Sequence, residues 1–208
     1  MSGSITVGGK ILASHDNVSG KLSMSENVDM SNMVFPAGHV IKTHYKHITD
    51  AYDISMNSDG SFKDVTDLFI DITTIASNSI FLFQFQGAWG RPSGNNHYTM
   101  RLARLINNLN ETYPVRSDPD GNRTSLGTGG FLPQSSAADN FEGYSQFIQI
   151  IDTPTYNVGD VLRYKLQATV NTNAGVIYIN RTNGHRDGGS NPFDPMGTSS
   201  FVVMEIAQ

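Results

Sequence analysis

The chain has 208 residues, enough for one domain with a sizeable core, and its formal net charge is −5. Only 16% of the residues are charged and 10% are aromatic, while 20 residues are glycine. This balance favours an all-β protein with many turns over a helical one. The negative charge weighs against nucleic acid as a partner, and the absence of cysteine excludes disulfides and thiolate metal sites.

No stretch of the chain has the roughly 20 apolar residues of a membrane-spanning helix, so we expect no membrane partner. The first ten residues, MSGSITVGGK, also lack the apolar core of a secretory signal. Glycosylation sequons begin at Asn17, Asn110, Asn122 and Asn180. Without a secretory signal these four sequons are expected to be coincidental.

Residues 1–34 are polar, rich in Ser and Gly, and poor in closely spaced apolar residues. Such a segment cannot bury enough apolar surface to fold alone. We therefore predict an extended N-terminal arm, which is either a frayed terminus or an anchor that orders on a partner. In the anchoring alternative the contacts come from the apolar residues of the arm, which are Ile5, Val7, Ile11, Leu12, Val18, Leu22 and Met24.

Residues 161–170 show the alternation of a half-buried strand most clearly. One face is apolar and consists of Leu162, Tyr164, Leu166, Ala168 and Val170. The other face is polar and is expected to lie in water. Turn residues follow at 171–175, and then a second β-rich run at 176–179. The two runs predict an antiparallel hairpin.

The predicted core is aromatic. In strand 80–89 one face carries Phe81, Phe83, Phe85 and Trp89, whose rings bury large apolar areas. Gln84 and Gln86 take the opposite face, which is then solvated or faces another subunit. In strand 65–75 the same alternation places three apolar residues on one face, Leu68, Ile70 and Ile72.

Five further strands are predicted at 39–47, 52–56, 97–106, 144–151 and 200–206. Eight to nine strands separated by turns, with no helix, predict an all-β antiparallel jelly-roll sandwich. Three long loops are expected at 87–97, 114–143 and 182–197, and loops of that length usually carry function. Candidate contact residues in these loops are Arg91, Asn95, Asn96, Arg123, His185, Arg186, Asp187 and Phe193.

No motif for catalysis or metal binding is complete. Asp118, Asp120 and Asn122 are spaced like the start of a calcium loop, but Gly129 stands where a bidentate Glu is required. His44 and His47 are three apart on a predicted strand and therefore point to opposite faces. No Gly-x-Ser-x-Gly elbow occurs. We expect no metal, no cofactor and no enzymatic activity, with a glycan depolymerase as the remaining enzyme alternative.

Five short motifs follow one another along the chain: FPAGHV at 35–40, FKDVTDL at 62–68, IDTP at 151–154, VIYINR at 176–181 and SFVVMEIA at 200–207. Their order resembles a group of small virion structural proteins of marine bacteriophages and cyanophages, of the tail-fibre-like or capsid-decoration kind. The resemblance implies a jelly-roll head that forms a homotrimer, loosely similar to C1q or tumour-necrosis-factor-like heads, without enzymatic activity.

The resemblance also implies where the protein acts. Together with the polar composition of residues 1–34, it implies an anchoring arm, 1–34, and a head, 35–208, in a virion protein that is made in the host cytoplasm. The short arm favours a capsid decoration (cement) protein or short head fibre bound to the major capsid protein. The alternative is a tail-fibre or tail-tip head, bound to tail components, whose long loops contact host-surface glycan or protein.

Overall fold

The computed structural model describes residues 3–7, 10–15, 22–24, 35–57, 59–90, 98–114, 143–170, 175–182 and 196–208. The chain divides into two compact units, Met1–Val34 and Phe35–Gln208. This boundary coincides with the one expected between arm and head. None of the described residues belongs to a helix of the length and hydropathy that crossing a membrane requires.

The first unit contains three short strands, β1 (Gly3–Val7), β2 (Lys10–His15) and β3 (Leu22–Met24). They pair antiparallel in the order β1-β2-β3. The sequence predicted a single extended arm, whereas the described parts of this segment pair with one another. Pairing satisfies backbone groups that an extended segment would leave to a partner, and the Gly8-Gly9 dipeptide between β1 and β2 favours tight hairpins.

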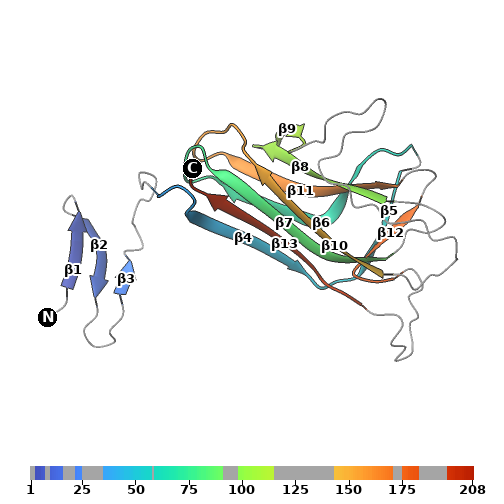
Figure 1. The fold of residues 1–208 in the computed structure, drawn as a ribbon, viewed down its shortest axis with the longest axis horizontal. Helices are drawn as coiled ribbons and strands as arrows, with labels where there is room; N and C mark the ends of the chain where they lie inside the picture. The colour runs from blue at the N-terminus through green and yellow to red at the C-terminus, as the bar shows by residue number, and fades with distance from the viewer. Residues whose placement is uncertain are drawn as a thin grey trace. The chain divides into compact units, whose positions relative to one another are not determined.

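The second unit, the head, contains two antiparallel sheets (Figure 1). The larger sheet consists of β4 (Val40–Ile48), β5 (Tyr52–Ser55), β7 (Ile80–Gly90), β10 (Gly143–Asp152), β12 (Val176–Ile179) and β13 (Ser199–Ile206). The smaller sheet consists of β6 (Lys63–Thr73), β8 (Tyr98–Ile106), β9 (Leu109–Thr112) and β11 (Val161–Val170). The described residues of the head contain no helix, which confirms the all-β prediction.

The strand order is that of a jelly roll. In the larger sheet β4, β13, β7 and β10 are neighbours, and β7 also pairs with β12, which in turn pairs with β5. In the smaller sheet the order is β6-β11-β8-β9. With β5 and β12 set aside, the first strand lies beside the last and the second beside the next to last. Such wrapping produces two facing four-stranded sheets, as in a jelly-roll sandwich.

The core lies between the two sheets and agrees with the predicted faces. Phe81, Phe83, Phe85 and Trp89 on β7 are fully buried, and the Phe83 ring meets Phe201 of β13 edge to face at 4.5 Å between centroids. The apolar faces predicted for β6 and β11 are also buried, namely Leu68, Ile70, Ile72, Leu162, Tyr164, Leu166, Ala168 and Val170. In β8 the alternate residues Tyr98, Met100 and Leu102 are buried in the same way, as the alternation of the strand predicts. Period-two alternation therefore identified the buried face of each of these strands correctly.

The predicted hairpin between 161–170 and 176–179 is wrong. β11 pairs along its length with β6 on one edge and β8 on the other, so neither edge is free for β12. Instead β12 pairs with β5 and with the end of β7 in the other sheet. Alternation specifies which face of a strand is buried, but it does not specify the neighbouring strand.

One strand of the described head was not predicted at all. β9 follows β8 after Asn107 and Asn108, which have positive φ angles of 52° and 61°. Two successive residues at positive φ form the tight turn that suits a two-residue hairpin, and Asn tolerates this conformation. The Asn-Asn dipeptide was the signal in the sequence that could have revealed β9.

Candidate functional site

The outward face of the smaller sheet is covered by paired charges. Arg163 of β11 donates two hydrogen bonds to Asp71 of β6, at 2.6 and 2.7 Å. Lys165 lies between two carboxylates, 2.9 Å from Asp64 and 2.7 Å from Glu111. Each of these charges therefore has an opposite charge beside it within the sheet.

Glu111 and Lys165 affect each other's protonation. Burial raises the pKa of Glu111, but hydrogen bonds involving Lys165, Tyr113 and Gln167 outweigh burial and hold that pKa below its ordinary value. Burial lowers the pKa of Lys165, but its bonds to Glu111 and Asp64 outweigh burial and raise that pKa. Both groups are therefore charged at neutral pH and are not poised to transfer a proton.

Arg101 of β8 completes this polar face. Its guanidinium carbon lies 3.8 Å from the centroids of both the Phe62 and the Tyr113 ring. Its Nε donates to the Gln167 side chain at 2.7 Å, and Gln167 in turn donates to Asp64 at 2.7 Å. A cation stacked between rings and bonded in its own plane is held rigidly. The arrangement stabilises the sheet surface.

A second charged group lies between the sheets. Asp152, at the end of β10, accepts hydrogen bonds from Arg104 of β8 at 2.7 and 2.6 Å and from the Tyr164 hydroxyl of β11 at 2.8 Å. Asp152 is buried. Burial and then Asp152 raise the pKa of Tyr164, so the phenol remains a donor. This group joins the two sheets and is too enclosed to meet a substrate.

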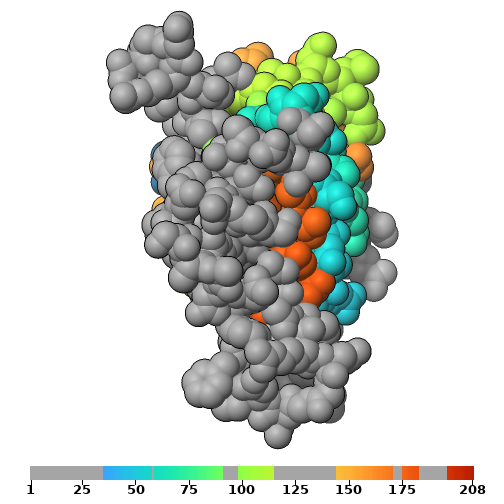
Figure 2. All heavy atoms as spheres, turned by 90° about the vertical axis from the view of Figure 1, so that its right-hand side faces the viewer, coloured from blue at the N-terminus to red at the C-terminus, as the bar shows by residue number. Residues whose placement is uncertain are grey.

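Asn180 organises the end of the head where β12 meets β5 (Figure 2, β12 in orange beside β5 in cyan). Its side-chain nitrogen donates to the carbonyls of Ile48 and Asp50, and its side-chain oxygen accepts from Ser199. Asn180 is fully buried. The sequon that begins there is therefore closed to glycosylation in the folded protein.

The described surface includes two hollows that are lined in part by charged residues. One, of about 750 Å³, is lined by residues 49–53, Arg181 and Met196, and contains the Arg181–Asp53 ion pair. The other, of about 330 Å³, lies on the smaller sheet and is lined in part by Phe69, Arg163 and Lys165. Each hollow contains at least one ion-paired side chain. Among the described residues that line them, neither hollow brings a nucleophile next to a general base.

The outward face of the larger sheet differs from that of the smaller one. It exposes large apolar side chains, with Tyr45 of β4 79% exposed and Phe147 and Ile151 of β10 63% and 57% exposed. Gln84 lies half-buried on this face and Gln86 lies exposed on it, as predicted for a solvated or subunit-facing side. Exposed apolar surface of this extent on one face commonly marks an interaction site. We name the outward side of β4, β13, β7 and β10 the uncharged face, because its outward residues within 43–47, 80–86, 145–151 and 200–206 include no Asp, Glu, Lys or Arg.

The predicted histidine geometry is confirmed. His44 is half-buried on the inward side of β4 and His47 is exposed on the outward side. Burial and then the neighbouring Lys42 lower the pKa of His44, so its imidazole is neutral at pH 7. Within the described part of the chain, no three His, Asp or Glu side chains gather in a way that could hold a metal ion.

The predicted contact residues fall mostly outside what the structure describes. Six of the arm residues lie in strands, Ile5 and Val7 in β1, Ile11 and Leu12 in β2, and Leu22 and Met24 in β3, whereas Val18 is outside the described residues. The loop candidates Arg91, Asn95, Asn96, Arg123, His185, Arg186, Asp187 and Phe193 are all outside the described residues. Both sets therefore stay predictions. Sequence reasoning missed Tyr45, Phe147 and Ile151, although Phe147 and Ile151 each alternate with buried neighbours in β10.

No protein-family model and no curated protein sequence matches this chain. Among solved structures, the chain is similar to the D431N mutant VP2 protein of infectious bursal disease virus in derived T=1 particles, with 7% identity and a TM-score of 0.37 over 89% of this chain. It is also similar to a structure of the Gx strain of the same virus, with 12% identity and a TM-score of 0.32 over 85% of this chain. The chain spans about 40% of the length of these two proteins.

Proposed function

We propose that this protein is a non-enzymatic structural component of a virus particle, a homotrimeric capsid decoration protein or short head fibre. The N-terminal unit anchors it to the major capsid protein, and the jelly-roll head projects from the shell. The observation that carries this proposal is the division of the chain into a small N-terminal unit and a self-contained head. The phage-protein motifs found in the sequence all lie in the head.

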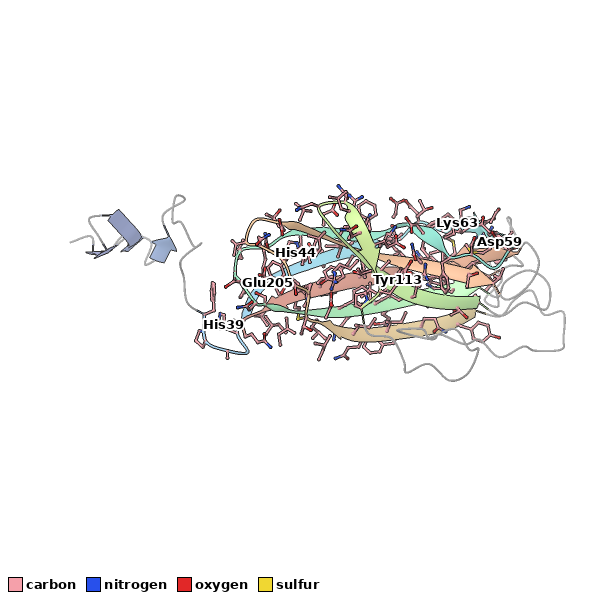
Figure 3. The ribbon with its side chains drawn as sticks, turned by 90° about the horizontal axis from the view of Figure 1, so that it is seen from above. His39, His44, Asp59, Lys63, Tyr113 and Glu205 are labelled. Atoms are coloured by element: carbon pink, nitrogen blue, oxygen red, sulfur yellow. The ribbon has the colours of Figure 1, made fainter. Side chains whose placement is uncertain are left out.

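The two ends of the head are also suited to different tasks. The head begins beside its own C-terminus, since Gly38 and His39 form backbone hydrogen bonds with Ala207. The ends of β7, β10 and β12 that border the long loops lie at the opposite end, where Gly90 pairs with both Gly143 and Tyr178. Figure 3 shows this separation, with His39 and Glu205 at one end and Lys63 and Asp59 at the other. A protein anchored before Phe35 can therefore present the loop-bearing end outward.

The charged groups on the smaller sheet support a structural role. Arg163, Lys165 and Glu111 are engaged by opposite charges or hydrogen bonds within the sheet. Catalytic acids and bases usually lie in clefts where their pKa values approach neutrality, and not in ion pairs that keep both partners charged. These pairings support the proposed structural role of the described surface.

A tail-fibre or tail-tip receptor-binding head is the second candidate function. It is favoured by the meeting of loop-bordering strand ends at one end of the sandwich, where Val170 also pairs with Tyr98. Loops gathered at one end of a rigid β-sandwich are a common way to build a binding site. In this alternative the loops contact host-surface glycan or protein.

Cryo-electron microscopy of the intact particle tests the proposal, because it counts and places copies of the head. We expect many copies distributed over the shell, and we expect deletion of residues 1–34 to remove them. A few copies confined to the tail would favour the receptor-binding alternative. Absence of the protein from the particle would overturn both functions.

A further inference from the structure

The two outward faces of the head differ in charge. On the smaller sheet the outward side carries Arg163, Lys165 and Glu111, with Asp64 and Asp71 as partners. The outward positions of the larger sheet are the alternate residues within 43–47, 80–86, 145–151 and 200–206. None of these outward residues is Asp, Glu, Lys or Arg. The uncharged face is therefore distinct from an ordinary solvated sheet surface.

The charges that these four strands do possess all point the other way. Lys42 and Lys46 of β4 take inward positions, opposite Glu205 and Phe201 of β13. Glu205 is fully buried, and Asp152 of β10 is buried against Arg104. A strand that borders water usually places its charges outward and keeps its core side apolar. In β4, β10 and β13 the charged residues instead take inward positions, where the two carboxylates are buried, Lys42 remains exposed and Lys46 is half-buried.

The outward residues have the composition of a protein–protein contact. Tyr45, Phe147 and Met204 belong to residue types that are enriched at interface cores, whereas Lys, Glu and Asp are depleted there. Four strands about 4.8 Å apart and seven residues at about 3.3 Å each give a footprint on the order of 400 Å². This footprint is shared between apolar side chains and the uncharged side chains of Gln, Ser, Thr and His.

We infer that the uncharged face is the surface through which copies of this head contact one another. This inference rests on the proposed function, because that function takes the head to be a homotrimer. In a symmetric assembly the same residues recur around the axis, so any charge near the axis meets a like charge. A face without charges avoids that repulsion, whereas an acidic glycan would be matched by basic groups, and the described outward positions of this face have no Lys or Arg.

The mass of the full chain in solution tests the inference, measured by light scattering after size exclusion over a wide concentration range. We expect the wild-type protein at three times the chain mass of 22.7 kDa, about 68 kDa. Phe147→Asp should reduce the mass about threefold, to that of one chain, because it places a charge on the uncharged face. Leu109→Asp is the matched control and should leave the mass unchanged, since Leu109 is 64% exposed and Phe147 63%, and Leu109 lies on the other sheet.

Circular dichroism of each variant establishes that it is folded. Should Phe147→Asp fail to fold, Tyr45→Asp decides the question from another strand of the same face, where the side chain is mostly exposed. A wild-type protein that stays monomeric at every concentration would overturn the inference. An oligomer that keeps its mass in folded Phe147→Asp and Tyr45→Asp would overturn it as well.

The failure of this inference is separable from failure of the proposed function. A monomer that is nevertheless found on the capsid would leave the virion role in place and remove the self-contact. If the protein is a trimer that Phe147→Asp dissociates but is absent from the particle, the self-contact stands and the virion role fails.

Discussion

Asp152 connects the two sheets through hydrogen bonds from Arg104 and Tyr164. Replacement by Ala would leave the Arg104 guanidinium largely buried without its carboxylate, and breaking a buried ion pair typically costs about 3–5 kcal/mol. At roughly 2–4 °C per kcal/mol for a domain of this size, we expect Asp152→Ala to lower the melting temperature by about 10 °C or more. Differential scanning calorimetry measures this change.

The control for Asp152→Ala is Arg163→Ala, which removes an ion pair of similar geometry from a partly exposed position. Exposed pairs contribute about 0–1 kcal/mol, so this variant should melt within a few degrees of the wild type. Equal losses of stability in the two variants would show that Asp152 does not hold the sheets together.

Glu205 shows what period-two reasoning misses at the scale of one residue. In β13 both alternating faces contain apolar residues, so the alternation alone does not show which face is buried. Packing of Phe201 and Val203 into the core carries Glu205 inward with them. There its Oε1 accepts from Ser79 at 3.0 Å, while its Oε2 has no partner among the described residues. A buried carboxylate contradicts expectation, and only its neighbours in the fold reveal it.

At the scale of elements, Gly90 is where three strands meet. It pairs with Gly143 of β10 on one side and Tyr178 of β12 on the other. A Cβ at Gly90 would run into the Arg181 carbonyl oxygen and lie 2.9 Å from both Thr182 Cα and Tyr178 Cβ. Because two of these atoms belong to the backbone, rotation of a side chain cannot relieve the clash.

We therefore expect Gly90→Ala to destabilise the head by about 1–3 kcal/mol, the usual cost of overpacking a dense site. Urea unfolding followed by Trp89 fluorescence measures the change, since Trp89 is the only tryptophan and lies next to Gly90. Ser55→Ala, at an exposed position of β5 outside the uncharged face, is the control and should cost well under 1 kcal/mol. A Gly90→Ala protein as stable as the wild type would mean that β12 is free to move away from β7.

The same junction shows why topology was harder to predict than strand positions. Strands 161–170 and 176–179 were predicted correctly, but proximity in sequence suggested a hairpin that does not form. Both edges of β11 are taken by β6 and β8, which lie roughly 60–100 residues earlier in the chain. Hydrogen-bonding partners at that separation leave no signal in local alternation. The uncharged face could not be predicted from the sequence either, because its residues come from four strands that only the fold brings together.

At the scale of the whole molecule, the jelly-roll head should fold without the first 34 residues. Among the described residues, the ten strands of the head pair only with one another, in two sheets. The described core consists entirely of residues from 48 onward. Since no core residue is lost, deletion of 1–34 should change the melting temperature of the head by less than about 3 °C. The same deletion should abolish attachment to the particle if the N-terminal unit is the anchor.

Calorimetry of residues 35–208 beside the full chain separates these two effects. An unchanged melting temperature together with lost attachment identifies the N-terminal unit as an anchor that contributes little to the stability of the head. A fall of 10 °C or more would mean that the first unit supports the head directly, and loss of attachment would then reflect unfolding. Light scattering of the same protein adds one more distinction. A head that associates through its uncharged face keeps its oligomeric mass without residues 1–34, because every residue of that face lies between 43 and 206.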